Sequence, residues 1–399
     1  MKKTIQRFFL SLFYVPVFLS SEHSLECSIN DFAAHLYQET LSNSSKNELF
    51  SPYGLFNCLS MVYAGADLQT ADEMAQALHL QIAQEELPFY LSKLSNSLYA
   101  NSQNNGFTLT IANSLWIDSQ FSILPAYQKM IEEGFLGKMA SLDFTQKEQT
   151  ALTINQWIST KTNEQITNLL SPLDISKESK LILVNTLYFK GSWARAFEVK
   201  NTQRALFYKN EQEQKLVNMM KQTHFFPYYE TEEFQFLLLP FSSKHRTDRE
   251  MAAFFLLPKT ALSDIEQALS ASFFKKWVVS TQITHVQVQI PRFEQKIQYD
   301  LTKILPHLGM ISAFSDRANF SKINDHENLF INKAIHETFF SLDEKGVTAA
   351  AATAIGIGTT SIRILPPPIP FTANQPFLFG IVDLKSNVML FLGKMIDPQ

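Results

Sequence analysis

The 399-residue chain has very few cysteines and little charge. Cys27 and Cys58 are too few for the disulfide framework that holds small secreted domains together, so its stability is expected to come from a core. Cys58 stands in the apolar run 55–63 and is predicted to be a buried small side chain, with a Cys27–Cys58 disulfide as the alternative. Only 18% of the residues are charged and the formal net charge is -4, which gives no reason to expect nucleic acid or an anionic surface as partner.

No Pro/Gly/Ser-rich linker and no charge run divides the chain, so one compact domain is the simplest prediction. Hydrophobic residues make up 45% of the sequence, and 34 of them are phenylalanine. This composition is ample for a large core that is rich in aromatic side chains.

Catalytic and cofactor-binding motifs are also missing. The nine histidines include no H-E-x-x-H pair, and the chain has no G-x-S-x-G elbow, no phosphate-binding G-x-x-x-x-G-K and no C-x-x-C. A Ser-His-Asp site assembled from distant residues has no local signature, and nothing in the sequence points to one. We therefore expect neither an enzyme nor a bound metal or cofactor.

The N-terminus has the three-part layout of a secretory signal. Lys2 and Lys3 precede an apolar stretch over 8–19, which ends in Ser20-Ser21-Glu22. A first transmembrane helix is the alternative, but about a dozen apolar residues fall short of the ~20 that span a bilayer. Residues 1–21 are thus predicted to be a signal peptide and 22–399 the mature domain. We expect a secreted or extracellular protein, or a periplasmic one in a double-membraned bacterium.

Helical patterns come first in the chain and strand patterns later. An amphipathic helix is expected over 30–41, and an apolar, buried helix runs from Ser51-Pro52 to Gly65, which suits a left-handed position after the helix. Thr70 and Glu73 form a capping-box pattern for a third helix. Further patterns predict a helix around 154–158 and strands over 109–117, 181–188, 236–239, 254–257, 286–290 and 377–382. This order predicts an α+β protein.

One stretch, 344–363, has an unusual composition. After Glu344-Lys345-Gly346 come some fifteen residues without a charge or a large side chain, and only then Arg363, whereas exposed segments normally carry charge at every turn. An alanine-rich helix is one interpretation. Several β-branched residues, together with Gly356 and Gly358, disfavour it. The other interpretation is a segment that is an exposed loop in one state and a β-strand in another.

This stretch resembles the hinge of the reactive-centre loop of the serpin family. The resemblance extends from Asn30 to Pro398, because further segments fall in the family's order: Ser51-Pro52, 185–193, 218–220, 333–336, 376–379 and 391–394. It implies the serpin fold, a single domain with a large central mixed β-sheet, further sheets, about eight to nine helices and an exposed reactive-centre loop. The hinge would comprise Glu344, Lys345, Gly346, Val347, Thr348, Ala349, Ala350, Ala351 and Ala352.

The resemblance also implies a function, the irreversible inhibition of serine proteases, with cysteine proteases as an alternative target. The protease would attack the loop, form a covalent acyl complex and be carried across the inhibitor as the cleaved loop inserts into the main sheet. The inhibitor is expected to be a monomer, with no membrane contact after signal cleavage. A non-inhibitory serpin, acting as carrier, chaperone or storage protein, is the alternative. The uncharged, proline-free segment 346–354 favours an inhibitor, although Val347 replaces the usual threonine or serine.

Two bonds are candidates for the protease's cut. Counting forward from the hinge as in typical inhibitory serpins gives Thr360-Ser361, whereas counting back from Pro376-Phe377 gives a point nearer Arg363-Ile364. An extended strand from Glu344 to Thr360 covers ~53 Å, close to the ~54 Å diameter of a domain this size. We therefore favour Thr360. Arginine at Val347 or Ala349 is expected to block insertion without unfolding the protein, provided that the loop is exposed before cleavage.

The resemblance assigns a role to a few residues away from the loop. Ser51, Asn185 and His336 would form a polar cluster beneath the sheet, where two central strands part, although Gly54 stands where a second serine is usual. His336 on its own would be read as a buried histidine with satisfied hydrogen bonds. Trp193 would lie where the hinge first enters the sheet.

Overall fold

The computed structural model describes residues 24–42, 44–104, 107–243, 250–326, 328–347 and 366–399. The predicted signal peptide lies outside the described residues. So do Thr348–Ala352 of the hinge and both candidate scissile bonds, Thr360-Ser361 and Arg363-Ile364.

Eight α-helices are found in the part of the chain that the structure describes, as expected. Their bounds are α1 Leu25–Leu36, α2 Pro52–Gly65, α3 Leu68–Ala77, α4 Leu87–Asn104, α5 Pro125–Gly134, α6 Lys147–Lys161, α7 Leu262–Ala268 and α8 Ala271–Ser280. A π-helical turn, η1 (Tyr37–Leu41), extends α1. Four 3₁₀ turns complete the helical elements: η2 Pro172–Asp174, η3 Val199–Asn201, η4 Leu305–Leu308 and η5 Ser312–Phe314.

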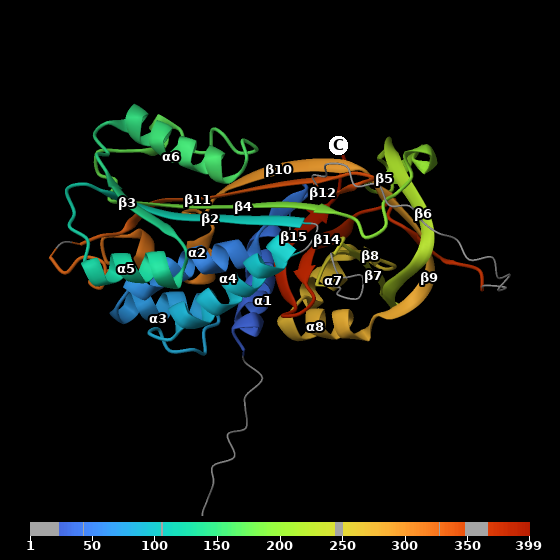
Figure 1. Cartoon of the computed structure of the whole chain (residues 1–399), viewed down its shortest axis with the longest axis horizontal. Helices are drawn as coiled ribbons and strands as arrows, with labels where there is room; N and C mark the ends of the chain where they lie inside the picture. Colours follow the sequence, from blue (N-terminus) through green and yellow to red (C-terminus); the bar gives the residue numbers. More distant parts are fainter. Residues whose placement is uncertain (1–23, 43, 105–106, 244–249, 327, 348–365) are drawn as a thin grey trace, which may run out of the picture.

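A six-stranded mixed sheet, here called the main sheet, runs through the middle of the molecule (Figure 1). Its order is β10 (Phe293–Asp300), β11 (Ile331–Leu342), β12 (Gly346–Val347), β4 (Leu181–Ser192), β2 (Phe107–Asp118) and β3 (Lys138–Leu142). β11 and β4 also pair with each other, in parallel, whereas β2 and β10 run antiparallel to their neighbours β4 and β11. This is the central mixed sheet that the resemblance implied.

A second sheet of nine strands packs against the main sheet. Its order is β1 (Glu48–Phe50), β15 (Val388–Met395), β14 (Phe377–Asp383), β8 (Met251–Pro258), β7 (Phe234–Pro240), β6 (Gln214–Glu230), β9 (Gln282–Pro291) and β13 (Ile369–Thr372), with β5 (Gln203–Tyr208) beside β6. β13 is the first strand after the segment 348–365 and pairs in parallel with β9. The chain therefore leaves the main sheet at β12 and returns at the edge of the second sheet.

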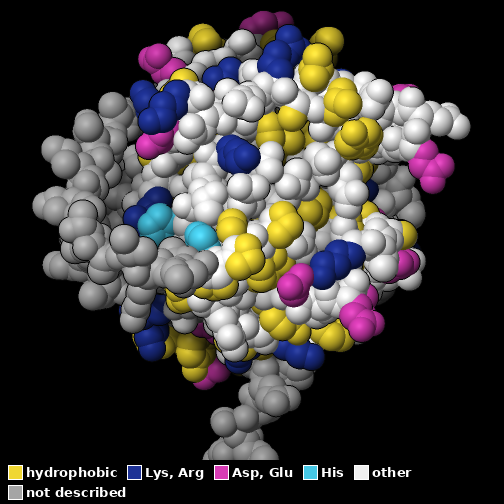
Figure 2. Space-filling model, turned by 90° about the vertical axis from the view of Figure 1, so that its right-hand side faces the viewer, with side chains coloured by type: hydrophobic (Ala, Val, Ile, Leu, Met, Phe, Trp, Pro, Cys, Tyr) yellow, Lys and Arg dark blue, Asp and Glu magenta, His cyan; other side chains and the backbone are white. Residues whose placement is uncertain are grey.

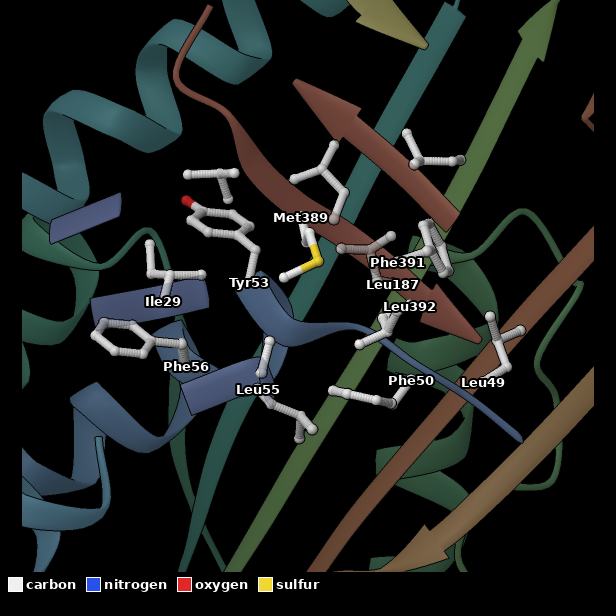
Figure 3. Close-up of a cluster of buried hydrophobic side chains, with 14 of the residues drawn as sticks. Ile29, Leu49, Phe50, Tyr53, Leu55, Phe56, Leu187, Met389, Phe391 and Leu392 are labelled. Atoms are coloured by element: carbon white, nitrogen blue, oxygen red, sulfur yellow. The ribbon is translucent and has the colours of Figure 1, made fainter. Parts of the chain in front are cut away.

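The core lies between these two sheets and the helices. All fourteen residues of α2 are buried, as their sequence predicted. Figure 3 shows side chains of α2 meeting others from α1, β1, β4 and β15; the labelled ones are Ile29, Leu49, Phe50, Tyr53, Leu55, Phe56, Leu187, Met389, Phe391 and Leu392. A smaller core lies on the opposite face of the main sheet, where Ile154 and Ile158 of α6 pack on Val184 and Ile335 (Figure 1). The main sheet is thus covered on both faces.

Several local predictions were wrong. Gly65 is the last residue of α2 and has no left-handed conformation; it is needed because a Cβ would lie 2.2 Å from Cγ1 of Ile323. Thr70 and Glu73 form no capping box, since α3 begins at Leu68 and their side chains bond to Asn319 and Ser312 instead. For the cysteines the prediction is confirmed, because Cys58 is a buried free thiol; Cys27 is free as well, so the alternative disulfide is absent.

No helix among the described residues is long and apolar enough to cross a membrane.

Candidate functional site

The predicted hinge begins as a short strand, β12, inside the main sheet. β4 and β11 pair directly as far as Tyr188 and Phe339, and beyond that point β12 fits between them. Val347 pairs with Gly191 on β4 and with Leu342 on β11, antiparallel to both strands. The end of the sheet is therefore already open by one strand at the position where the hinge starts.

Val347 is fully buried in the core between the two sheets. The expectation that an arginine is harmless there before cleavage was therefore wrong, because the premise of an exposed loop does not hold at this position. A charged side chain would have to leave the sheet or remain buried without a partner. Ala349, the other position proposed for arginine, lies outside the described residues.

A tight turn leads from β11 into β12. The carboxylate of Asp343 accepts hydrogen bonds from the backbone amides of Lys345, at 2.7 Å, and Gly346, at 3.1 Å. A Cβ at Gly346 would lie 2.0 Å from the carbonyl oxygen of Gly191, so only glycine lets the hinge approach β4 this closely. The sequence Asp343–Gly346 thus turns the chain back into the sheet.

Trp193 holds this turn from the side of β4. Its indole Nε1 donates to the carbonyl oxygen of Asp343 at 3.0 Å, and its backbone amide donates to that of Lys345 at 2.9 Å. The indole ring stacks on Phe241, with ring centroids 5.0 Å apart and planes at 8°. Trp193 therefore contacts Asp343 and Lys345, the residues that lead into β12.

Glu344 is the buried charge of the hinge. Thr202 donates its hydroxyl hydrogen bond to the carboxylate at 2.7 Å, and the guanidinium of Arg292 lies 3.9 Å away. The backbone amide of Phe197 donates to the Glu344 carbonyl at 2.8 Å. Lys345, by contrast, is exposed to solvent. The hinge is thus fastened by one carboxylate to two segments far away in sequence.

The three residues of the predicted polar cluster lie together further down the same two strands. Asn185 and His336 are partners in the β4–β11 ladder. Ser51 caps α2 with its hydroxyl, which accepts from the Gly54 amide at 3.0 Å, and its own backbone amide donates to Nε2 of His336 at 3.0 Å. The amide group of Asn185 donates to the side-chain oxygen of Asn113 on β2.

The cluster is buried and incompletely hydrogen-bonded. Burial lowers the pKa of His336 to about 3, and a backbone interaction with Asn185 offsets only part of this, so the imidazole is neutral at physiological pH. Because Nε2 accepts a hydrogen bond, Nδ1 carries the proton. Within the described part of the chain, this Nδ1, Oδ1 of Asn185 and the hydroxyl of Thr186 have no hydrogen-bond partner of normal geometry. Such groups are costly to leave unpaired.

Gly54, the departure from the family pattern, has a steric basis. A Cβ at this position would lie 2.8 Å from Oγ of Ser51 and 3.0 Å from Nδ2 of Asn185. A serine here would require both side chains to move. Glycine at this position therefore leaves Ser51 and Asn185 in the positions that they occupy here.

Sequence reasoning missed Arg292, Thr202 and Asn113, whose side chains reach the site from other parts of the chain. No local pattern marks them, because their partners lie 52, 142 and 72 residues away along the sequence. Asp343 was also missed, although an aspartate two and three residues before Lys345 and Gly346 is a recognisable turn signal. Among the described residues, no three His, Cys, Asp or Glu side chains gather where they could hold a metal ion.

Comparison with known proteins gives the same match over nearly the whole chain. The family model "Serpin (serine protease inhibitor)" matches residues 27–398. "Intracellular coagulation inhibitor 2" of Tachypleus tridentatus is 33% identical over 387 residues, which cover 94% of this chain and 91% of that protein. "Leukocyte elastase inhibitor" of Bos taurus is 33% identical over 381 residues, covering 92% and 97%.

A solved structure of similar fold is that of human thyroxine-binding globulin complexed with its ligand. It superposes with a TM-score of 0.84 at 25% sequence identity, covering 94% of this chain and 98% of that one.

Proposed function

The chain belongs to the serpin family, and we propose that it is an irreversible inhibitor of serine proteases that traps its target by loop insertion. The observation that carries the proposal is β12, which has already entered the main sheet between β11 and β4. If insertion continues in this register, the following residues form a new central strand with hydrogen bonds on both edges.

The register of β12 assigns a partner to each inserted residue. Continuing antiparallel from Val347 opposite Gly191 and Leu342, Thr353 would come to lie between Asn185 and His336. Its hydroxyl can both donate and accept, so it can bond to the unpaired Oδ1 of Asn185 and Nδ1 of His336. Insertion would then relieve a buried cluster whose hydrogen bonds are incomplete in the present state.

The two faces of the inserted strand match the two faces of the sheet. Val347 faces the core between the sheets, so 349, 351, 353, 355 and 357 would follow it there, and these are Ala, Ala, Thr, Ile and Ile. The alternate residues would face α6, whose core includes Val184 and Ile335. These are Thr348, Ala350, Ala352, Ala354, Gly356 and Gly358. Small side chains suit this face, because α6 packs on it.

The same register favours Thr360 as the residue before the cut. Residue 357 would lie opposite Leu181, where β4 begins, so Thr360 would lie just beyond the far end of the sheet. Cutting after Arg363 adds about 10 Å of chain, and a protease held there would be pressed less firmly against the inhibitor.

The chemistry of trapping belongs to the protease. Its serine Oγ attacks the carbonyl carbon of Thr360, the peptide bond to Ser361 breaks, and the amine of Ser361 leaves with the proton that the catalytic base took from the serine. The resulting ester joins Thr360 to the protease. We propose that insertion carries this ester to the far end of the sheet before water hydrolyses it. A cysteine protease would form the corresponding thioester.

Three proteases test the proposal. The protein is incubated with an elastase-like, a subtilisin-like and a trypsin-like enzyme, and the products are analysed in denaturant and by mass spectrometry. We expect a denaturant-resistant complex with the elastase-like or subtilisin-like enzyme and a released peptide that begins at Ser361. A stable trypsin complex with a peptide that begins at Ile364 would show that the protease cuts after Arg363 instead of Thr360. The absence of any covalent complex would overturn the proposed function.

A carrier function is the second candidate, because the fold is shared with the thyroxine-binding globulin, which was solved with a bound ligand. Val347 in place of the usual threonine or serine is also compatible with a serpin that does not inhibit. Failure to trap any of the three proteases, together with tight binding of a small apolar ligand, would favour this alternative.

We also propose that the mature protein is exported as a monomer. The support is the signal-like segment 1–21, which precedes the start of the family match at residue 27. One relative is named an intracellular inhibitor, so the relatives do not add to this proposal. Peptide mass mapping tests it: an intact Met1 N-terminus in the cytoplasm would contradict export.

A further inference from the structure

A pocket of about 430 Å³ lies where β5, the first part of β6 and the end of the chain meet. Three of the described residues that line it are cationic, Arg204, Lys215 and Arg292, and none of them is an aspartate or a glutamate. β5 and the C-terminus lie near one another at the top of the molecule in Figure 1, and several Lys and Arg side chains lie at the same end in the side view of Figure 2. A pocket with this charge attracts anions.

Two arginines and one asparagine form a row across this pocket. Arg204 on β5 is the direct partner of Asn218 on β6. On the other side of β6, Met219 pairs with Pro291 at the end of β9, and the backbone amide of the next residue, Arg292, donates to the carbonyl oxygen of Asn218 at 2.8 Å. Direct partners on neighbouring strands present their side chains to the same face of a sheet. Two guanidinium groups therefore flank one side-chain amide in the lining of the pocket.

The middle and one end of this row are available to a ligand. Within the part of the chain that the structure describes, the guanidinium of Arg204 makes no ion pair or hydrogen bond, and the side-chain amide of Asn218 makes no hydrogen bond. Both residues are exposed. Lys215 differs from them, because its ammonium group pairs with the carboxylate of Asp397 and its charge is already matched. The uncompensated positive charge of the pocket therefore belongs to the arginines.

We propose that Arg204, Asn218 and Arg292 form a binding site for a tetrahedral oxoanion, a phosphate or sulfate group that is free or carried by a small molecule. A guanidinium group presents paired N–H donors that match two oxygens of such an anion, and the amide nitrogen of Asn218 adds a donor between the two arginines. Leu216 lines the same pocket and is 52% exposed, so it offers an apolar surface to an organic group on the anion. This site is independent of protease inhibition.

The site shares Arg292 with the hinge. The guanidinium of Arg292 is half exposed and lies 3.9 Å from one carboxylate oxygen of Glu344, whose other oxygen accepts a hydrogen bond from Thr202. A bound anion places a second negative charge beside the same guanidinium, so the anion and Glu344 compete for it. Competition of this kind is reciprocal, because each ligand of a shared group weakens the other by the same factor. The anion should therefore bind more tightly when Glu344 loses its charge.

Calorimetric titration with inorganic phosphate and with phenyl phosphate, both at low ionic strength, tests the site. The variants are Arg204→Ala, Arg292→Ala and Glu344→Gln, with Arg317→Ala as a matched control, because Arg317 is an exposed arginine that lines a different pocket. We expect the dissociation constant to rise at least about tenfold in each of the first two variants. It should fall roughly threefold in Glu344→Gln, which keeps an acceptor for Thr202, and stay unchanged in the control.

Each outcome bears on the proposal. Tighter binding of phenyl phosphate than of inorganic phosphate supports the site and identifies a phosphate ester as its ligand, whereas equal or weaker binding of the ester identifies the free ion. Binding of neither probe would overturn the site. Unchanged affinity in Arg204→Ala and Arg292→Ala, or an equal loss in Arg317→Ala, would overturn it as well. An unchanged affinity in Glu344→Gln would refute the competition for Arg292. Arg204→Ala decides the matter if Arg292→Ala does not fold.

Discussion

Asn185 on β4 and His336 on β11 are direct partners in the ladder, and Nδ1 of His336 and Oδ1 of Asn185 are both buried without a hydrogen-bond partner of normal geometry in the described part of the chain. The register of β12 leads to this pair from the open end of the sheet, because Thr353 would lie between them after insertion. The two strands are thus joined at a position where a third strand would complete their hydrogen bonding. The hydrogen bonds gained on insertion would therefore favour the form with an inserted strand over the present structure.

His336 should make the protein less stable in mild acid. Burial lowers its pKa to about 3, so from pH 6.5 downward the unfolded chain binds a proton that the folded chain does not. The resulting loss in the free energy of unfolding is about 2 kcal/mol at pH 5. Urea unfolding of the parent and of His336→Gln at pH 8 and pH 5 measures it. Between pH 8 and pH 5, we expect the free energy of unfolding to fall by about 2 kcal/mol more in the parent than in the variant. Equal losses would contradict the lowered pKa of His336.

Glu344→Lys should loosen the hinge. The substitution removes the hydrogen bond from Thr202 and places a second cation beside Arg292 at a buried position. We expect the native state to lose roughly 2 kcal/mol of stability in urea unfolding. Glu198→Lys is the control, since Glu198 is exposed and its carboxylate bonds to Lys200 and Asn201, two exposed neighbours in the chain, and its effect should stay below about 0.5 kcal/mol. Similar losses for both variants would mean that the buried contacts of Glu344 do not hold the hinge.

Ala349→Arg should convert the inhibitor into a substrate. After cleavage this side chain would enter the core beside Phe189 and Phe340, where a charge has no partner, so the protease is released by hydrolysis. We expect cleaved inhibitor and active protease in place of the covalent complex, seen by denaturing electrophoresis. Leu365→Arg, on the released side of the bond, should still trap. Trapping by Ala349→Arg as efficient as by the parent would refute insertion.

Heparin should not accelerate inhibition. Residues 81–98, most of which lie in α4, hold Glu85, Glu86 and a single basic residue, Lys93, so few sulfates would be neutralised. The rate of complex formation at physiological salt is expected to change less than about twofold on addition of heparin. A many-fold acceleration would show that another basic surface binds the polysaccharide.

The sequence predicted the strands of both sheets well where alternation or apolar runs were long, as in β4 and β8, because burial of a whole strand leaves a strong pattern. Prediction from the sequence failed where a side chain bonds to a distant part of the chain instead of capping its own helix. Thr70 and Glu73 have capping-box spacing, but their oxygens bond to η5 and its neighbours, about 240 residues later.

The candidate site was predicted in part, for the same reason. The hinge residues and Trp193 lie in recognisable segments, and the structure brings Val347, Trp193 and Glu344 together at the open end of the main sheet. The burial of Val347 was not predicted, because the sequence alone does not show whether this valine lies in an exposed loop or in a strand. Arg292 could not be found, since only the folded chain places it near Glu344.

The crystal structure of the protein after cleavage at Thr360-Ser361 tests the central claim, insertion of the cleaved loop into the main sheet, most directly. The account predicts that residues 348–357 form a strand between β11 and β4, with Thr353 between Asn185 and His336 and its hydroxyl bonded to at least one of them. A cleaved protein in which Asn185 and His336 remain direct partners, with no strand between β4 and β11 below Val347, would contradict it.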